Sequence, residues 1–103
     1  MTTLQILTVP HDFPERSCRF SLGQVMITPH ANSQLTSEEV LTGLRRHACG
    51  DWGELCPEDR QANDEALRYG GGLLSVYGSG EGLFWVITES DRSVTTVLLP
   101  ADY

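Results

Sequence analysis

The fold is decided by residues 73–100, which have the sequence LLSVYGSGEGLFWVITESDRSVTTVLLP. Three runs in this stretch are rich in the β-branched and aromatic side chains that favour strands: residues 73–77, 83–89 and 93–99. The glycine-rich loop 78–82 joins the first two runs, and the tight turn 90–92 joins the second to the third. Pro100 ends the pairing, because proline has no backbone N–H to donate. The stretch therefore predicts an antiparallel β-meander.

Two helices are expected in the middle of the chain. The first begins after an N-cap at Thr36 or Ser37 and ends at Gly50, and its apolar residues recur at helical spacing. The second begins at Pro57, a residue suited to the first turn of a helix, and ends at the three glycines 70–72. Acidic residues in both first turns favour these starting points, because they complement the helix dipole.

A strand is also expected at residues 24–28, before Pro29. Strands on both sides of two central helices give an α+β domain. Its expected architecture is an antiparallel meander of three C-terminal strands, with at least one N-terminal strand, covered by the two helices. A chain of 103 residues has room for one core, so we expect a single domain over residues 20–103 and an N-terminal extension or tail over residues 1–19.

The charge balance restricts the function classes. Fourteen acidic residues face seven basic ones, giving a net charge of −7, and all seven basic residues are arginine. The missing lysine excludes Schiff-base chemistry, a P-loop lysine and a lysine general base. The negative charge argues against direct nucleic-acid binding, which depends on cations that displace condensed counterions. An electrostatically steered partner is expected to be a protein with a basic surface.

The expected cellular compartment is inferred from the lack of a membrane-span pattern, a signal-peptide pattern and a disulfide pattern. The apolar runs are strand-length, far short of the ~18–20 residues of a membrane span, so no membrane association is expected. Residues 1–4 have neither the basic start nor the apolar stretch of a signal peptide, which favours the cytoplasm. Cys18, Cys49 and Cys56 are an odd number without CxxC spacing, so a disulfide framework is not expected.

Residues 47–69 hold the densest group of chemically active side chains. A zinc site of His47, Cys49 and Cys56 fits poorly, because two ligands two positions apart on one helix point about 200° apart. For a cysteine nucleophile with His47 as its base, Cys56 has the better position, just before a helix, whereas Cys49 lies near a helix C-terminus. Neither alternative has a complete set of residues, and we expect no metal and no cofactor.

Two further hypotheses concern the carboxylates of the same segment. Asp51, Glu54 and Asp59 suit a carboxylate-based hydrolase that uses Mg²⁺. A small hydrolase or nucleotide-handling enzyme would combine His47, Asp51 and Glu54, and it predicts a concave pocket near Trp52. Non-catalytic roles compete with both, because Asp51 can cap a turn and Trp52 can fill the gap between helices and sheet.

Six acidic residues accompany a single arginine, Arg60, between positions 51 and 65. Such a run is often a solvated helix face, but it is also suited to docking on a basic surface. The leading hypothesis is therefore a non-enzymatic interaction protein. Its expected contact residues are Asp51, Trp52, Glu54, Glu58, Asp59, Asp64 and Glu65. A homodimer formed through an exposed edge of the meander is a third alternative.

The polar segment 89–93 separates the last two expected strands. We interpret it as a β-turn in which Asp91 bonds its own backbone and Arg92 pairs with Glu89. The alternative is an anion site, because an arginine in a rigid turn can bind a carboxylate or phosphate with two parallel hydrogen bonds.

Two groups of residues resemble a family of small bacterial proteins that are often labelled plasmid-related or hypothetical. The first is GDWG at residues 50–53, followed by Asp59, Asn63, Ala66 and Leu67, and the second is WVITESDRS at 85–93 with TTVLLP at 95–100. The resemblance covers residues 20–103 and implies carriage on mobile elements, with no catalytic residues to transfer. Small acidic proteins of mobile elements often inhibit host defence, so an anti-CRISPR or anti-restriction inhibitor is one form of the leading hypothesis.

Overall fold

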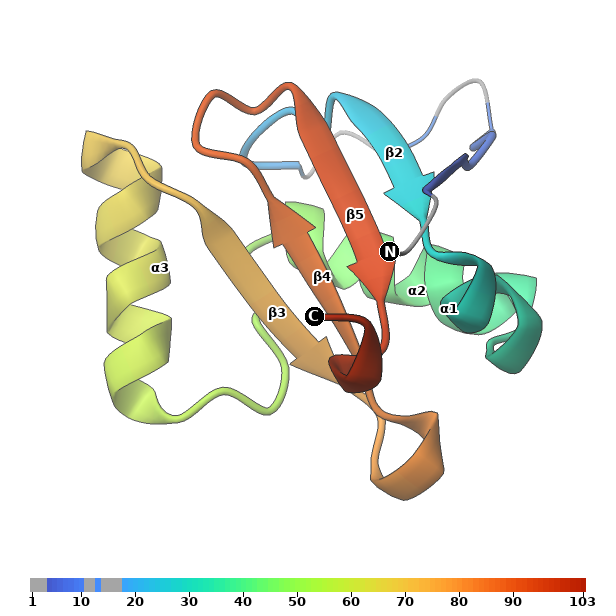
Figure 1. The fold of residues 1–103 in the computed structure, drawn as a ribbon. Helices are drawn as coiled ribbons and strands as arrows, with labels where there is room; N and C mark the ends of the chain where they lie inside the picture. Colours follow the sequence, from blue (N-terminus) through green and yellow to red (C-terminus); the bar gives the residue numbers. More distant parts are fainter. Residues whose placement is uncertain (1–3, 11–12, 14–17) are drawn as a thin grey trace.

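The computed structural model describes residues 4–10, 13 and 18–103 (Figure 1). In chain order its strands and helices are β1 (Gln5–Ile6), β2 (Gln24–Ile27), α1 (Pro29–Gln34), α2 (Ser37–Ala48), α3 (Pro57–Tyr69), β3 (Leu73–Tyr77), β4 (Phe84–Thr88) and β5 (Val94–Leu98). Two short 3₁₀ turns complete the described part, η1 (Gly80–Gly82) and η2 (Pro100–Asp102). None of the helices in this part of the chain has the length and apolar character to cross a membrane.

The α+β class is confirmed, and β3, β4 and β5 form the expected antiparallel meander. The N-terminal half of the sheet differs from the prediction. Strand β2 pairs in parallel with β5, and the five strands follow the order β1-β2-β5-β4-β3, so the sheet is mixed. Parallel pairing is possible here because a long connection, which includes the three helices, separates β2 from β5 in the chain.

Strand β2 ends in a helix that the sequence analysis did not anticipate. The Thr28 hydroxyl accepts a hydrogen bond from the Ala31 N–H, and Pro29 occupies the first turn, so α1 begins where only a strand end was expected. Threonine is a good N-cap, and proline tolerates the first helical position because its missing N–H is not needed there.

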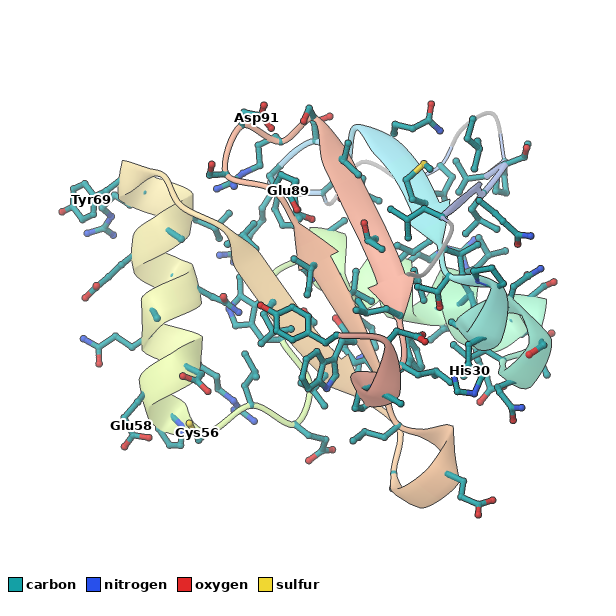
Figure 2. The ribbon with its side chains drawn as sticks, in the orientation of Figure 1. His30, Cys56, Glu58, Tyr69, Glu89 and Asp91 are labelled. Atoms are coloured by element: carbon teal, nitrogen blue, oxygen red, sulfur yellow. The ribbon has the colours of Figure 1, made fainter. Side chains whose placement is uncertain are left out.

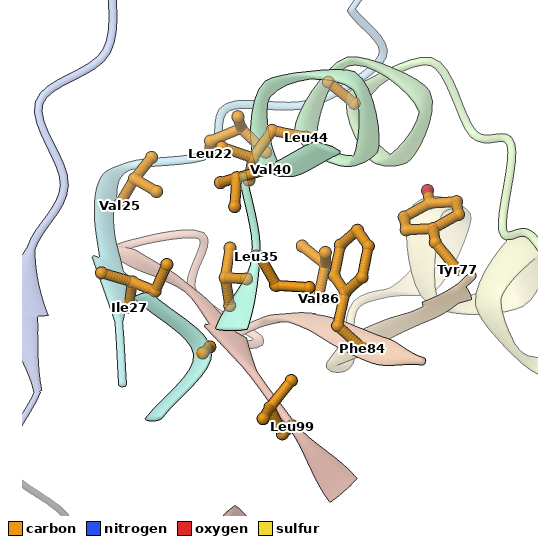
Figure 3. Packing of buried hydrophobic residues seen from close by; sticks show 13 residues of the cluster. Leu22, Val25, Ile27, Leu35, Val40, Leu44, Tyr77, Phe84, Val86 and Leu99 are labelled. Carbon is orange, nitrogen blue, oxygen red and sulfur yellow. The ribbon is translucent and has the colours of Figure 1, made fainter. Parts of the chain in front are cut away.

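Helices α1 and α2 lie on one face of the sheet and enclose the main core (Figure 1). The Thr36 side chain and Glu39 form a capping box at the start of α2, which confirms the N-cap expected at Thr36. Figure 3 shows Val40 and Leu44 of α2 directed toward the sheet residue Val86. These side chains are almost completely buried, so each contributes hydrophobic stabilisation to this face.

Helix α3 lies beside β3 rather than over the sheet (Figure 1). The Asn63 amide donates to the Leu74 carbonyl at 2.6 Å and accepts from the Leu74 N–H at 3.2 Å, as a neighbouring strand would. Farther along the edge, Val76 donates to Trp52 O and accepts from the Glu54 N–H. These contacts satisfy backbone groups that an edge strand otherwise exposes to another chain.

The segment expected as an N-terminal extension is described in part. Residues 5 and 6 pair with β2 as β1, and Leu7, Val9 and Phe13 pack against the main core. The remaining residues of that segment, 1–3, 11–12 and 14–17, lie outside the described residues.

Candidate functional site

The expected acidic contact residues lie on α3 and on the loop that leads into it. Cys56 is the N-cap of α3, Pro57 occupies its first turn, and Glu58 and Asp59 follow in that turn. Both carboxylates are exposed, and Figure 2 shows Glu58 directed away from the sheet. Their negative charge stabilises the start of the helix through the dipole, and their position leaves them open to a partner.

Two of the six acidic residues are engaged with partners outside the segment 56–65. The Asp51 carboxylate accepts from Arg46 at 2.8 and 3.2 Å and from the Gly53 N–H, and the Arg46 guanidinium holds the pKa of this carboxyl below its usual range. The Asp64 carboxylate accepts the indole N–H of Trp52 at 3.0 Å. The other four acidic residues are exposed, and we call them the acidic surface: Glu54, Glu58, Asp59 and Glu65.

Trp52 fills the space between α3, β3 and the preceding loop, as the structural interpretation of the sequence expected. Its side chain is 5% exposed and packs with Leu55 and Leu73. The indole also stacks on Phe20, with the ring centroids 6.2 Å apart. Trp52 therefore holds the acidic segment in place from beneath, and its ring is not available for surface contact.

Arg60 is the only arginine between positions 51 and 65, and its guanidinium is directed toward the loop backbone. Nε donates to Leu55 O, and a terminal nitrogen donates to Gly53 O, each at 2.9 Å. Because these donors are engaged with carbonyls, Arg60 fixes the shape of the loop.

His47, the base of the enzyme hypothesis, lies in the interior. Its side chain is fully buried between α2 and the sheet, with Nδ1 2.6 Å from Ser75 Oγ and Nε2 2.9 Å from Thr88 Oγ1. Thr88 Oγ1 lies 2.7 Å from Thr95 Oγ1, and the Thr95 hydroxyl donates to Leu22 O. Burial, with a smaller effect of the Arg92 charge, lowers the pKa of His47 to about 3.

The donors and acceptors in this chain of hydrogen bonds can be assigned by starting from the Leu22 carbonyl at its end. The Leu22 carbonyl only accepts, so Thr95 uses its single proton there and must accept from Thr88. Thr88 has then used its own proton, so His47 donates from Nε2 and accepts from Ser75 at Nδ1. The imidazole is therefore a neutral Nε2–H tautomer with both nitrogens engaged.

The enzyme hypothesis required His47, Asp51 and Glu54 to converge near Trp52. The imidazole is enclosed in the core and bonded to sheet hydroxyls, whereas Asp51 and Glu54 are exposed on the loop. Asp51 is further engaged with Arg46. The three side chains thus differ in environment and in partners, and the geometry offers the imidazole no surface at which to meet a substrate.

The described part of the chain contains no group of three or more His, Cys, Asp or Glu side chains placed to hold a metal ion. Its three cysteines are free thiols: Cys18 and Cys56 are exposed, and Cys49 is half-buried. The backbone N–H of Asp59 lowers the pKa of the Cys56 thiol, but the side chains of Glu58 and Asp59 together raise it by more. The resulting higher pKa disfavours the thiolate that a nucleophile needs.

The polar segment 89–93 has a structural role. Arg92 has a positive φ of 63°, and its guanidinium donates to the carbonyls of Gly71, Glu89, Ser90 and Ala66. The sequence analysis expected pairing with Glu89, and the contact is with its backbone oxygen. Asp91 accepts from the Ser93 N–H and hydroxyl, as expected for a carboxylate that bonds the turn. Arg92 thus ties the turn to the C-terminal end of α3.

A histidine–carboxylate pair escaped the sequence analysis. His30 Nδ1 lies 3.3 Å from Asp102, whose carboxylate also accepts from the Thr28 hydroxyl at 2.7 Å and from the Leu99 N–H at 3.0 Å. The pair lies beside an open cavity of about 460 Å³. No local pattern could have revealed it, since His30 and Asp102 are 72 positions apart.

No protein-family model, curated protein or solved structure matches this chain, so its own residues carry the functional argument.

Proposed function

We propose that this protein is a small acidic binding module that docks onto the basic surface of a protein partner. The contact is made by the acidic surface of Glu54, Glu58, Asp59 and Glu65, with Asp51 and Asp64 holding the segment in shape. The proposed partner is a nucleic-acid-handling complex, because such complexes present basic surfaces to phosphates. Inhibition of a restriction or CRISPR-type defence complex is the form of this function that the plasmid-related resemblance favours.

The observation that carries the proposal is the orientation of α3. Its inward side is used to protect the β3 edge through Asn63 and to pack Ala66 and Leu67, so its carboxylates face solvent. Arg60, the one cation within the acidic segment, is held by backbone carbonyls. Arg60 keeps its charge in these contacts, but one cation cannot balance six carboxylates, so the segment presents net negative charge.

A rigid, uncompensated acidic surface has a defined physical effect. Opposite charges accelerate association and select basic partners, and salt weakens them, because the Debye length is only about 8 Å at physiological ionic strength. Side chains held by a folded helix also lose less conformational freedom on binding than a disordered acidic tail does. Fast, salt-sensitive binding to basic protein surfaces is the expected behaviour.

The test is capture of partners from host extract on the tagged protein, at low and at high salt, followed by affinity measurement with the purified partner. The double variant Glu58→Lys/Glu65→Lys reverses two charges of the acidic surface. The matched control is Glu38→Lys/Glu81→Lys, which makes the same change in net charge, also alters one helix first turn, and leaves the acidic surface intact.

We expect the first variant to bind the partner about tenfold or more weakly and the control to bind within about twofold of the wild type. Equal weakening by both variants would mean that only net charge matters. Unchanged affinity of the Glu58/Glu65 variant would refute the acidic surface as the contact.

A further inference from the structure

The face of the sheet opposite α1 and α2 carries a second set of apolar side chains. In β3 and β4 the side chains alternate between fully buried and half-buried, and the half-buried ones point away from the main core. They are Leu74, Val76, Trp85 and Ile87. Met26 of β2 and Thr96 of β5 continue the same face.

Strand register arranges these residues in rows. Leu74 lies opposite Ile87, Ile87 opposite Thr96, and Thr96 opposite Met26. A second row joins Val76 to Trp85 and Trp85 to Leu98. We call the half-buried members of both rows the open face: Met26, Leu74, Val76, Trp85, Ile87 and Thr96.

Among the described residues no α-helix covers the open face. In Figure 1, α2 lies behind the sheet, α1 lies beyond the end of β2, α3 lies beside β3, and only the short turn η2 lies in front, at the lower end of β4. One end of the face is covered, since Leu98 in the second row is only 6% exposed and the Tyr103 ring lies 5.3 Å from that of Trp85. The six side chains are half-buried, and Leu74 and Val76 also pack against the cluster of Trp52, Leu55 and Leu73. The apolar surface open to a partner therefore centres on Met26, Trp85 and Ile87, and apolar surface of this kind is where interaction sites are sought.

The size of the open face suits one helix. Strands lie about 4.8 Å apart, so β3, β4 and β5 span about 10 Å, which is the diameter of one α-helix. Five residues of strand extend about 17 Å, the length of roughly 11 helical residues. From β3 to β2 the face has a projected area of roughly 250 Å², whereas each partner of a standard interface buries about 800 Å². The face is therefore too small for a standard interface between two globular domains.

The charge around the open face argues for a basic occupant. Residues 70–103, which supply three of its strands, contain four acidic residues and one arginine. That arginine, Arg92, donates to four backbone carbonyls. Glu89 and Asp91 lie exposed at one end of the sheet (Figure 2). A second copy of the chain would bring acidic rims together, whereas arginines or lysines flanking an apolar helix face would pair with them.

From these observations we infer that the open face is a docking site for an amphipathic helix of a protein partner, with an apolar stripe flanked by basic residues. The helix would complete a three-layer arrangement with the sheet in the middle. Its apolar stripe would cover Trp85 and Ile87, and its basic flanks would face Glu89 and Asp91. This site is separate from the acidic surface on α3, and either one can hold if the other fails.

The test is a methyl and amide NMR titration of the full chain with a designed peptide. The probe is an 18-residue amphipathic helix with a leucine stripe flanked by arginines. A scrambled peptide of the same composition keeps the charge and loses the stripe. We expect the amphipathic peptide to shift the methyl signals of Leu74, Val76 and Ile87 and to leave those of Ile27 and Val97, on the opposite face, unchanged.

Two variants test the location. Ile87→Glu places a charge in the apolar row, and Thr96→Arg changes an already polar position and repels the basic flanks. Thr42→Glu, exposed on α2, is the control. We expect the first variant, where it folds, and the second to weaken the peptide about tenfold and the control to leave its affinity within twofold.

Three outcomes would overturn the inference. One is equal binding of both peptides, and another is peptide-induced shifts confined to α3. The third is concentration-dependent shifts of the open-face methyls without peptide, which would identify a second copy of the chain as the occupant. None of these depends on the variants of Glu58 and Glu65, so the failures of the two proposals are distinguishable.

Discussion

Nε2 of His47 lies 2.9 Å from the hydroxyl of Thr88, and the imidazole donates this hydrogen bond. The contact belongs to a chain that runs from Ser75 through His47, Thr88 and Thr95 to the carbonyl of Leu22. In this arrangement the Ser75 hydroxyl donates to Nδ1, so a second proton on the imidazole would require that hydroxyl to turn away. The core is therefore built around an uncharged histidine.

The first prediction is that the protein loses stability as the pH falls from 7.5 to 5. The native pKa of His47 is about 3, and that of an unfolded histidine is about 6.5, so the unfolded state binds more protons between these values. Linkage then lowers the free energy of unfolding by about 2 kcal/mol between pH 7.5 and pH 5. Urea denaturation across this range measures the slope.

The control for this prediction is the titration of the native imidazole itself. NMR of the folded protein should show no protonation of His47 down to pH 5, with a proton on Nε2 and none on Nδ1. A native titration midpoint near 6.5 would contradict it. The window stays above the range in which Asp51, Asp91 and Asp102 protonate, because hydrogen bonds lower the pKa of each of these carboxyls.

The second prediction is that Thr88→Val destabilises the protein by about 1–3 kcal/mol. Valine keeps the shape of threonine but removes the acceptor of His47 Nε2–H and the donor to Thr95. Thr96→Val is the matched control, because Thr96 is half-buried on the open face, and we expect a change within about 0.5 kcal/mol. Equal effects of the two substitutions on the denaturation midpoint would argue against the buried chain as the cause.

The sequence predicted the parts of the fold that depend on local signals. The meander follows from strand-forming runs separated by turn residues, and the start of α2 from the N-cap candidates Thr36 and Ser37 with the acidic first turn behind them. The direction of β2 could not be predicted in this way, because a four-residue strand has no local preference for a parallel or an antiparallel neighbour. Helix α1 was missed although Thr28 and Pro29 are typical of a helix start, because Pro29 was interpreted only as a strand end.

Function was harder to predict from the sequence because the same residue types serve as binding groups and as structural ones. Asp51 and Asp64 belong to the acidic run, yet Arg46 and Trp52 engage their carboxylates. His47 is suited to catalysis by its chemistry, but three-dimensional packing buries it. The partners of His47 lie 28 and 41 positions away, so no local pattern reveals its burial. Arg46 and Trp52 lie only 5 and 12 positions from Asp51 and Asp64, but the sequence does not show whether these side chains meet.

The third prediction is that Asn63→Ala destabilises the protein by about 2–3 kcal/mol. The substitution removes both hydrogen bonds between the side-chain amide and the backbone of Leu74, leaving a buried part of the β3 edge unpaired. Gln61→Ala, on the exposed side of α3, is the control and should change stability by less than about 0.5 kcal/mol. Hydrogen exchange provides a direct measure, since the Leu74 amide should lose protection in the Asn63 variant even where α3 remains helical.

The fourth prediction concerns Arg92, whose positive φ opposes the contacts of its side chain. Arg92→Gly relieves about 1 kcal/mol of backbone strain but removes hydrogen bonds to the carbonyls of Gly71 and Ala66 at the end of α3. Because hydrogen bonds from a charged donor each contribute about 1.5–3 kcal/mol, losing these two bonds outweighs the relief of strain, and we expect a net destabilisation of about 2–5 kcal/mol.

Arg92→Lys separates charge from geometry, because lysine keeps the cation and the strained φ but lacks the planar fork that reaches several carbonyls. It should therefore be at least as unstable as Arg92→Gly, as measured by thermal and urea denaturation. A glycine variant more stable than the wild type would show that the guanidinium contacts contribute less than the strain of the turn. The connection from the β4–β5 turn to α3 would then depend on packing rather than on Arg92.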